Sequence, residues 1–343
     1  MIRCTFGTTV LQISDFSSFH IEMITSQIAK QAALLPLEII EEEPTSQFPV
    51  FKQILENKHR AASLCLSDAA DFGASVVQNA RVNLAKPHRL LFDLKNAFSG
   101  IPAILVGAGP SLEENGHLLP EGAIIFAGGH ALKKISRSPH FGAIVDKNSL
   151  DFSQFDFPIC MQPRAYPIEG DILMAPDSHY PVMGETFDGG WTVGNFMAAI
   201  AVYFGCHPIV CVGMDYCTRD GKKYAFEETK VEPQEDWIMS VAWLENLEKN
   251  HPETTFFNAS NGLQYFTPCK LEDFSFEKKP IGEIIRDRLS KVKRQTSEFD
   301  ATSMLQPLWQ IWEPVFSRAG NFTEEQMRIH RDLFFQQVLG TYD

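Results

Sequence analysis

Two glycines and a serine stand directly behind a short apolar run, in the stretch AILVGAGPSLEEN from Ala103 to Asn115. Glycines at the end of a buried strand let the backbone turn tightly and approach a ligand closely. Ser111 occupies a helix N-cap position, and Glu114 three residues later completes a capping-box pattern. Amides at the start of a helix suit a phosphate. We therefore predict that a nucleotide binds through Gly107, Gly109, Pro110 and Ser111; the alternative is a plain strand-to-helix turn with a capping serine.

The loop does not specify which nucleotide it binds. A dinucleotide fingerprint has a small residue where Leu112 stands, and an acidic residue at the end of the second strand, which here reads Phe126-Ala127-Gly128-Gly129-His130. A Walker loop has Gly-Lys-Ser or Gly-Lys-Thr, which this stretch lacks. Both departures count against NAD and against a P-loop site. S-adenosylmethionine, and with it a methyltransferase, stays open as an alternative.

Two aspartates end later apolar runs. Asp146 follows the third run in GAIVDKNS, and Asp215 follows the fifth in VGMDY. Ligands of open α/β sheets bind outside the carboxyl ends of the strands. A carboxylate there holds a ribose hydroxyl, a metal or a proton in transfer. We predict that Asp146 contacts the nucleotide and that Asp215 is catalytic; the alternative for each is a helix cap or a turn bond.

A second informative stretch is GGWTVGNFMAAIAVYFGCHP, residues 189–208. The part from Phe196 to Phe204 is apolar all round, as in a helix buried inside a domain. Gly205 follows it as a natural C-terminal cap. The start of such a helix presents backbone amides to a ligand. We predict nucleotide contacts from Thr192, Val193, Gly194 and Asn195; a buried helix that merely begins with a capping threonine is the alternative, and the two are compatible.

A histidine lies in the loop just upstream of that helix, His179 in PDSHYPV. A loop histidine can accept and return a proton near neutral pH, so we predict that His179 is the general base. The alternative is a surface or packing residue. The ten histidines and the carboxylates show no HExxH or comparable spacing, so we expect no metal held by protein ligands alone and no tightly bound cofactor.

These side chains need a scaffold, and the apolar runs indicate which one. Short apolar runs that alternate with helix-length connectors are typical of a parallel sheet covered on both faces. Right-handed crossovers turn such a sheet into an open, doubly wound, Rossmann-like α/β fold with a mostly parallel sheet. The predicted strands are Ala103–Val106, Ala123–Ala127, Ala143–Val145, Ile159–Met161 and Ile209–Val212.

The chain of 343 residues divides into three regions by pattern. Residues 1–95 form a mixed, partly helical N-terminal region, residues 96–270 the Rossmann-like nucleotide-binding core, and residues 271–343 a C-terminal helical region. Apolar spacings of three and four residues predict the helices outside the core. They are Gln47–Asn57, Ala61–Leu84, Gly282–Lys293 and Glu324–Val338.

Composition excludes several classes of protein. The net charge of −13 argues against a nucleic-acid or anionic-membrane surface. Seven cysteines without a CxxC pair fit a reducing compartment, and the N-terminus lacks a signal-peptide pattern, so we expect a cytoplasmic protein.

The segment Trp191–Met214 contains no Asp, Glu, Lys or Arg, but Gly205 and Pro208 interrupt it. We read it as a helix, a turn and a strand rather than a membrane span.

The stretches IPAILVGAGPSLEEN, GAIVDKNS and GGWTVGNFMAAIAVYFGCHPIVCVGMDYCTRDGKKYA occur in an order that resembles the 6-hydroxymethylpterin diphosphokinase-like domain family. That family includes the bacterial motility accessory factors and is similar to bacterial sialyltransferases that use CMP-sialic acid. The resemblance covers about residues 75–230. It implies a bacterial glycosyltransferase-like enzyme that moves a CMP-activated nonulosonic acid to a protein or glycan acceptor.

In the similar sialyltransferases, the glycine loop and the helix start contact the CMP part of the donor, and a general-base histidine precedes the helix. This implies the same roles for the Gly107–Ser111 loop, for the helix start at Thr192–Gly194 and, at a different spacing, for His179. Archaeal diphosphokinases of the family carry Asp-x-Asp-Gly where this chain has Asp146-Lys147-Asn148, with only the first acid. A pterin diphosphokinase that uses Mg-ATP, and a non-catalytic binding protein, therefore stay as alternatives.

Overall fold

The computed structural model describes residues 1–14, 17–135, 137–147, 155–178, 183, 186–218, 225, 235–299, 309–310, 313–314, 317 and 322–339. The chain separates into two compact units by its contacts. The first unit comprises Met1–Ala74 and Ala301–Asp343, and the second comprises Ser75–Asp300. The three-region division, with borders at residues 95 and 270, rests on sequence pattern and stays a prediction.

The first unit contains a three-stranded antiparallel sheet in the order β2-β1-β3. Ile2, Cys4 and Phe6 alternate along the central strand and are buried, so one face of the sheet supplies the core. Phe51 and Leu55 of the long helix α2 pack into the same core. The elements are β1 (Ile2–Phe6), β2 (Thr9–Ile13), α1 (Ser18–Ala32), β3 (Leu37–Glu41), α2 (Phe48–Ala85) and α8 (Glu324–Leu339).

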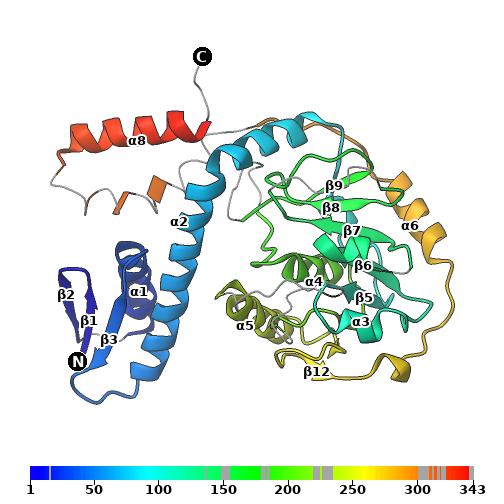
Figure 1. Cartoon of the computed structure of the whole chain (residues 1–343), viewed down its shortest axis with the longest axis horizontal. Helices are drawn as coiled ribbons and strands as arrows, with labels where there is room; N and C mark the ends of the chain where they lie inside the picture. The colour runs from blue at the N-terminus through cyan, green and yellow to red at the C-terminus, as the bar shows by residue number, and fades with distance from the viewer. Residues whose placement is uncertain are drawn as a thin grey trace. The chain divides into compact units, whose positions relative to one another are not determined.

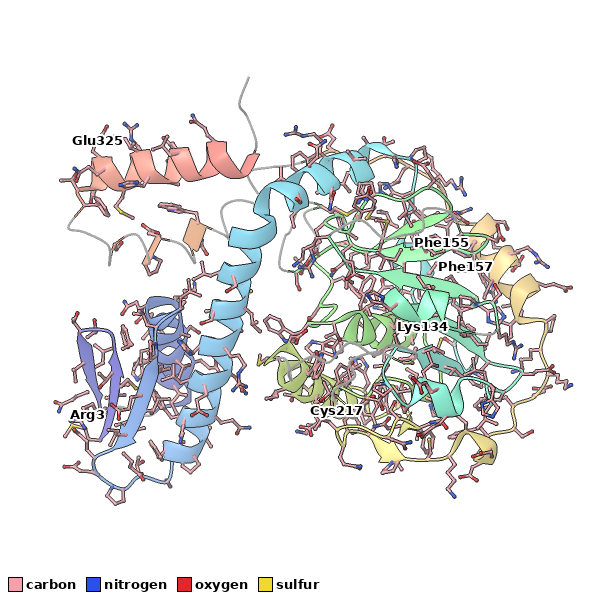
Figure 2. All side chains as sticks on the ribbon, in the orientation of Figure 1. Arg3, Lys134, Phe155, Phe157, Cys217 and Glu325 are labelled. Atoms are coloured by element: carbon pink, nitrogen blue, oxygen red, sulfur yellow. The ribbon has the colours of Figure 1, made fainter. Side chains whose placement is uncertain are left out.

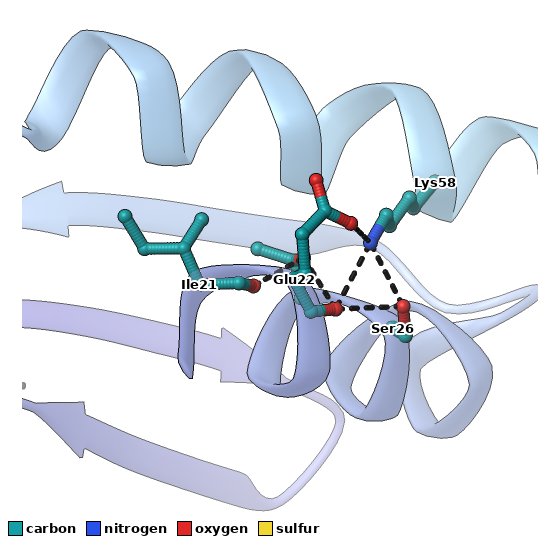
Figure 3. A network of polar contacts seen from close by, with 5 residues as sticks. Ile21, Glu22, Ser26 and Lys58 are labelled. Atoms are coloured by element: carbon teal, nitrogen blue, oxygen red, sulfur yellow. Dashed lines mark hydrogen bonds and ion pairs between the residues drawn. The ribbon is translucent and has the colours of Figure 1, made fainter. Parts of the chain in front are cut away.

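The helix α2 is continuous where the sequence predicts two helices with a gap at residues 58–60. Those residues are tied to α1. The Lys58 ammonium donates to the Glu22 carboxylate, to the Glu22 carbonyl at 2.9 Å and to the Ser26 hydroxyl at 2.8 Å (Figure 3). His59 Nε2 lies 3.0 Å from the Ala32 carbonyl oxygen. Lys58 and His59 therefore hold this part of α2 against α1 through polar contacts, which a pattern of apolar spacings does not detect.

The second unit is built on a nine-stranded sheet in the order β12-β11-β10-β5-β6-β7-β8-β9-β4 (Figure 1). Every neighbouring pair is parallel, which confirms the predicted open, doubly wound α/β fold. The strands are β4 (Arg89–Leu90), β5 (Ala103–Val106), β6 (Ile124–Gly128), β7 (Phe141–Ile144), β8 (Ile159–Met161), β9 (Ile172–Met174), β10 (Ile209–Val212), β11 (Phe256–Asn258) and β12 (Thr267–Pro268).

Each face of this sheet has its own core. Leu105, Phe126 and Phe141 belong to a core with the buried helix α4, whereas Ile104, Ile125 and Val210 belong to a core on the other face. The strands therefore read as continuous apolar runs, because both faces are covered. The covering elements are η1 (Leu91–Leu94), α4 (Val193–Tyr203), α5 (Glu235–Asn250) and α6 (Ile281–Ser290) on the first face, and α3 (Leu112–Asn115), η2 (Gly129–Lys133) and η3 (Leu271–Asp273) on the second.

The strand order reverses between β5 and β10. From β5 the chain adds β6, β7, β8 and β9 on one side, and then passes through α4 to place β10 on the other side of β5. Such a switch point leaves a crevice outside the carboxyl ends of the two strands, where ligands of open α/β sheets bind. The described part of the chain contains no helix with the length and apolarity needed to cross a membrane.

Candidate functional site

The loops after β5 and β10 interlock at the switch point. The Gly107 amide donates to the Val212 carbonyl at 2.8 Å, and the Gly109 amide donates to the Gly213 carbonyl at 2.7 Å. A Cβ on Gly107 would lie 2.4 Å from the Gly213 carbonyl oxygen. Glycine is therefore needed at position 107 because the two backbones touch there.

Asp215 ties three loops together. Its Oδ2 accepts the Ser111 amide at 2.9 Å, and its Oδ1 accepts the Asn261 amide at 3.0 Å from the loop after β11. The residue is 3% exposed, so these bonds are shielded from water. A Cβ on Gly109 would lie 2.3 Å from Oδ2. These contacts are those of a positioning carboxylate; the predicted catalytic role of Asp215 stays a prediction.

The predicted capping box at Ser111 is wrong. The Ser111 side chain makes no cap hydrogen bond, because the short helix α3 begins with Ser111 already in a helical conformation. Glu114 instead accepts the Asn261 side-chain amide at 2.7 Å. Ser111 Oγ is buried and has no hydrogen-bond partner among the described residues. A buried hydroxyl left without a partner is costly, and a ligand is one explanation for it.

Most of the backbone amides with which this loop could bind a phosphate already donate hydrogen bonds within the protein. Those of Gly107, Gly109 and Ser111 all donate to groups of the β10 loop. Pro110 has no amide hydrogen and is buried. Nucleotide binding by this loop stays a prediction, and the Ser111 hydroxyl is the group in it that lacks a protein partner among the described residues.

The start of α4 has the predicted cap. Thr192 Oγ1 accepts the Asn195 amide at 3.3 Å, and Asn195 Oδ1 accepts the Thr192 amide at 3.3 Å. Asn195 also donates to the Ser240 carbonyl at 3.0 Å, so both capping side chains act within the protein. The amides of Val193 and Gly194 are the first two of the helix and have no hydrogen-bond acceptor among the described residues.

Gly128, the last residue of β6, and Gly129, the first residue of η2, pack against the first turn of α4. A Cβ on Gly128 would lie 2.7 Å from Val193 Cγ2. At Gly129, whose φ is +51°, a Cβ would lie 3.6 Å from both Asp146 Oδ2 and Val193 Cγ1. The exposed Asp146 carboxylate, the glycine pair and the start of α4 therefore meet at the carboxyl edge of β6 and β7. Sequence reasoning missed this pair, although two glycines at a strand end were the available signal.

Tyr216 closes the other side of the α4 start. Its backbone has φ of +50°, and a Cβ on Gly194 would lie 2.5 Å from its hydroxyl. The hydroxyl lies 3.4 Å from Thr192 Oγ1. Burial raises the pKa of Tyr216 above its ordinary value, which keeps the phenol protonated as a hydrogen-bond donor. Tyr265 supports this loop by donating to the Met214 carbonyl at 2.6 Å.

A buried polar frame holds the loops after β7, β8 and β9. Asn79 of α2 donates to the carbonyls of Lys147 and Arg164, both at 3.0 Å. The Asp146 carbonyl accepts the Tyr166 amide at 2.7 Å. Arg164 Nε lies 2.7 Å from the fully buried carboxylate of Asp177. The frame fixes the backbone that carries Asp146, and it was missed because its partners lie far apart in the sequence.

His179, the predicted general base, falls outside the described residues. Lys134, labelled in Figure 2, donates to the Ala225 carbonyl, and the Ala225 amide donates to the Ala108 carbonyl at 2.8 Å. Among the described residues, no group of three or more His, Cys, Asp or Glu side chains is arranged to hold a metal.

Comparison with known proteins supports the resemblance drawn from sequence. Residues 75–221 match the sequence model of the family described as 6-hydroxymethylpterin diphosphokinase MptE-like. The solved structure of MAf glycosyltransferase from Magnetospirillum magneticum AMB-1 is similar to 96% of this chain, with a TM-score of 0.59 and 12% identity. This chain spans 64% of that protein's length, and at this identity the likeness establishes the fold. No curated protein matches the sequence.

Proposed function

We propose that this protein is a nucleotide-binding transferase, most similar to a glycosyltransferase whose donor is a CMP-activated nonulosonic acid and whose acceptor is a hydroxyl of a protein or glycan. One observation carries the proposal. The α4 start, the Gly128-Gly129 pair and Asp146 meet at the carboxyl edge of the sheet, beside the switch point. The family match over residues 75–221 and the shared fold support it.

Each part of this cluster has a chemical role in the proposal. The amides of Val193 and Gly194, with the positive end of the α4 dipole, bind the donor phosphate. Asp146 accepts hydrogen bonds from ribose hydroxyls. The Gly128-Gly129 pair lets the first turn of α4 approach the end of β6 closely, which brings the α4 amides to this edge of the sheet. The Ser111 hydroxyl gains in the ligand the partner that it lacks in the described protein.

The proposed reaction is a displacement at the anomeric carbon of the donor. The acceptor oxygen forms a bond to that carbon, the bond from the carbon to the phosphate oxygen breaks, and CMP leaves with the electron pair. A base takes the acceptor proton. Tyr216, held protonated beside the α4 start, donates a hydrogen bond to the leaving phosphate. In this proposal Asp215 acts through the loops that it holds.

The test is thermal stabilisation by CMP, UDP, ATP with Mg²⁺, and S-adenosylmethionine. A ligand that binds the folded state alone adds about 2.7 kcal/mol of stability at a hundredfold excess over its dissociation constant. We expect a shift with CMP. Ser111→Ala should keep the stability of the unliganded protein, because its hydroxyl has no partner, and should reduce the CMP shift. No shift with any of the four ligands would contradict both enzyme assignments.

A pterin diphosphokinase is the second candidate, because the matching family is described by that activity. It would transfer a diphosphate from Mg-ATP to a hydroxymethylpterin and release AMP. The chain has Asp146 but Asn148 where the acidic motif has its second carboxylate. Formation of AMP that requires both Mg²⁺ and the pterin would select this candidate. Nucleotide binding without turnover of either donor would select the non-catalytic binding protein.

A further inference from the structure

A histidine stands at the cluster that the proposed function uses. His130 directly follows the Gly128-Gly129 pair at the carboxyl end of β6, and its side chain is exposed. Its neighbour Gly129 is the position at which a Cβ would lie 3.6 Å from Asp146 Oδ2. His130 is the next residue of η2, and adjacent Cα atoms are about 3.8 Å apart, so the backbone of His130 belongs to the same turn as Gly129.

The other described histidines of the second unit lie elsewhere. His140 Nδ1 accepts the Ile125 amide at 3.0 Å ahead of β7, and His207 Nδ1 accepts the Thr255 amide at 3.1 Å ahead of β10. Three more lie away from the carboxyl edge: ahead of β4, between α3 and β6, and ahead of β11. These are His88, His117 and His251.

The described histidines of the second unit therefore differ in which edge of the sheet they lie at. A residue ahead of a strand lies at the amino edge of a parallel sheet, and a residue directly after a strand lies at the carboxyl edge where ligands bind. In the described part of the second unit, His130 is the histidine that lies just past the carboxyl end of a strand, two residues after β6 ends at Gly128. The proposed transfer needs a base for the acceptor proton, and imidazole is the side chain most suited to that task near neutral pH.

We propose that His130 is the general base that activates the acceptor hydroxyl. This rests on the proposed function. His130 takes the proton from the acceptor oxygen as that oxygen bonds to the anomeric carbon, and CMP departs with the electrons of the broken bond. The proton then passes from the imidazolium to solvent. No oxidant, reductant or further co-reactant enters the step.

The test uses CMP-N-acetylneuraminic acid as donor and water as acceptor, with released CMP as the readout. We expect His130→Ala to lower the rate of CMP release by about 10²- to 10⁴-fold, the usual contribution of a general base. The thermal shift caused by CMP should stay unchanged. Added imidazole should restore part of the lost rate, because it fills the vacated position. His251→Ala, at the amino edge, is the matched control and should release CMP at the wild-type rate.

The outcomes separate this inference from the proposed function. A wild-type protein that neither binds CMP nor releases it overturns the proposed function, and the base with it. An active wild type that His130→Ala leaves unchanged overturns the base alone. A lost rate that imidazole does not restore, with the CMP shift retained, also overturns the base. So does a loss of CMP release that His179→Ala causes and His130→Ala does not.

Discussion

The carboxylate of Asp215 accepts the backbone amide of Ser111 across the switch point, at 2.9 Å. The two residues belong to neighbouring strand ends that are far apart in the sequence. Because Oδ1 of the same carboxylate accepts the Asn261 amide, one side chain sets the positions of three loops. The glycine loop owes its shape to this carboxylate as well as to its own residues.

Replacing that carboxylate should destabilise the protein. Asp215→Asn keeps the size of the side chain but presents an amide hydrogen to one of the two backbone donors, Ser111 or Asn261. A buried donor left unsatisfied costs about 1–3 kcal/mol. The midpoint of urea denaturation measures the loss. An unchanged midpoint would mean that the two bonds do not hold the loops.

A methyl group at the loop contact should be costly too. Gly107→Ala places a Cβ 2.4 Å from the Gly213 carbonyl oxygen, which must shift. Overpacking of this kind costs about 1–3 kcal/mol. The matched control is Gly282→Ala in α6, where the added Cβ meets only the Arg286 side chain at 3.8 Å. It should be neutral or stabilising, since alanine favours a helix. Equal urea midpoints for the two variants would contradict the interlocked loops.

The cap of α4 should matter for stability and for the ligand together. Thr192→Ala removes the oxygen that accepts the Asn195 amide, at a cost of about 0.5–2 kcal/mol. Thr192→Ser retains that oxygen and should stay close to wild type. Thermal melts with and without CMP check both effects. The contrary result is an alanine variant whose melting temperature and CMP shift match those of the serine variant.

Asp146 should matter for the ligand alone. Its carboxylate is exposed and has no hydrogen bond or ion pair among the described residues, so Asp146→Asn should leave the unfolding free energy unchanged. A hydrogen bond to a charged group contributes about 1.5–3 kcal/mol, so the affinity for CMP should fall about tenfold or more. Titration calorimetry measures it, with Glu272→Gln on η3 as the control for a lost negative charge. A CMP affinity equal to wild type would remove Asp146 from the site.

His140 should make the protein less stable in mild acid. Burial, assisted by the charge of Arg137, lowers the pKa of His140 from 6.5 to about 4. Between pH 6.5 and pH 4 His140 is protonated in the unfolded chain but neutral in the folded protein. Stability therefore falls as the pH drops from 6.5 to 4, by at most about 1.4 kcal/mol per pH unit, and His140 adds no further loss below that window.

The variant His140→Asn tests this origin. Asparagine retains an acceptor for the Ile125 amide but has no proton to gain. Urea midpoints measured from pH 7 to pH 4 should fall less steeply for the variant than for wild type. Parallel slopes would place the acid sensitivity in other groups.

The strands of the large sheet and the cap of α4 could be predicted from the sequence, because each depends on residues that are close together in the chain. The apolar runs predict β5, β6, β7, β8 and β10, because strands covered on both faces carry no polar alternation. The Thr192 cap was predictable because its partner lies three residues away. The sheet of β1, β2 and β3 was missed, since apolar and polar residues alternate along its strands and form no continuous apolar run.

Side-chain roles that depend on distant partners were not predictable. Asp215 binds an amide 104 residues away, so nothing near it in the sequence shows that it holds the glycine loop. The Ser111–Glu114 box failed because Ser111 is already helical, and the Glu114 carboxylate instead accepts the side-chain amide of Asn261 from a third loop. The positions of polar residues after apolar runs predict which strand ends hold candidate site residues. The partner of each of these side chains depends on the order of the strands in the sheet.

That strand order also governs how the protein is made. In the finished sheet Ala103 of β5 pairs with Ile209 of β10, although β6 to β9 and α4 lie between them in the chain. During synthesis β5 therefore keeps one unpaired edge until β10 has emerged. An open apolar edge is a template for pairing with another chain. That edge stays open while residues 107–208 are being added, and the same step that joins β10 to β5 completes the crevice.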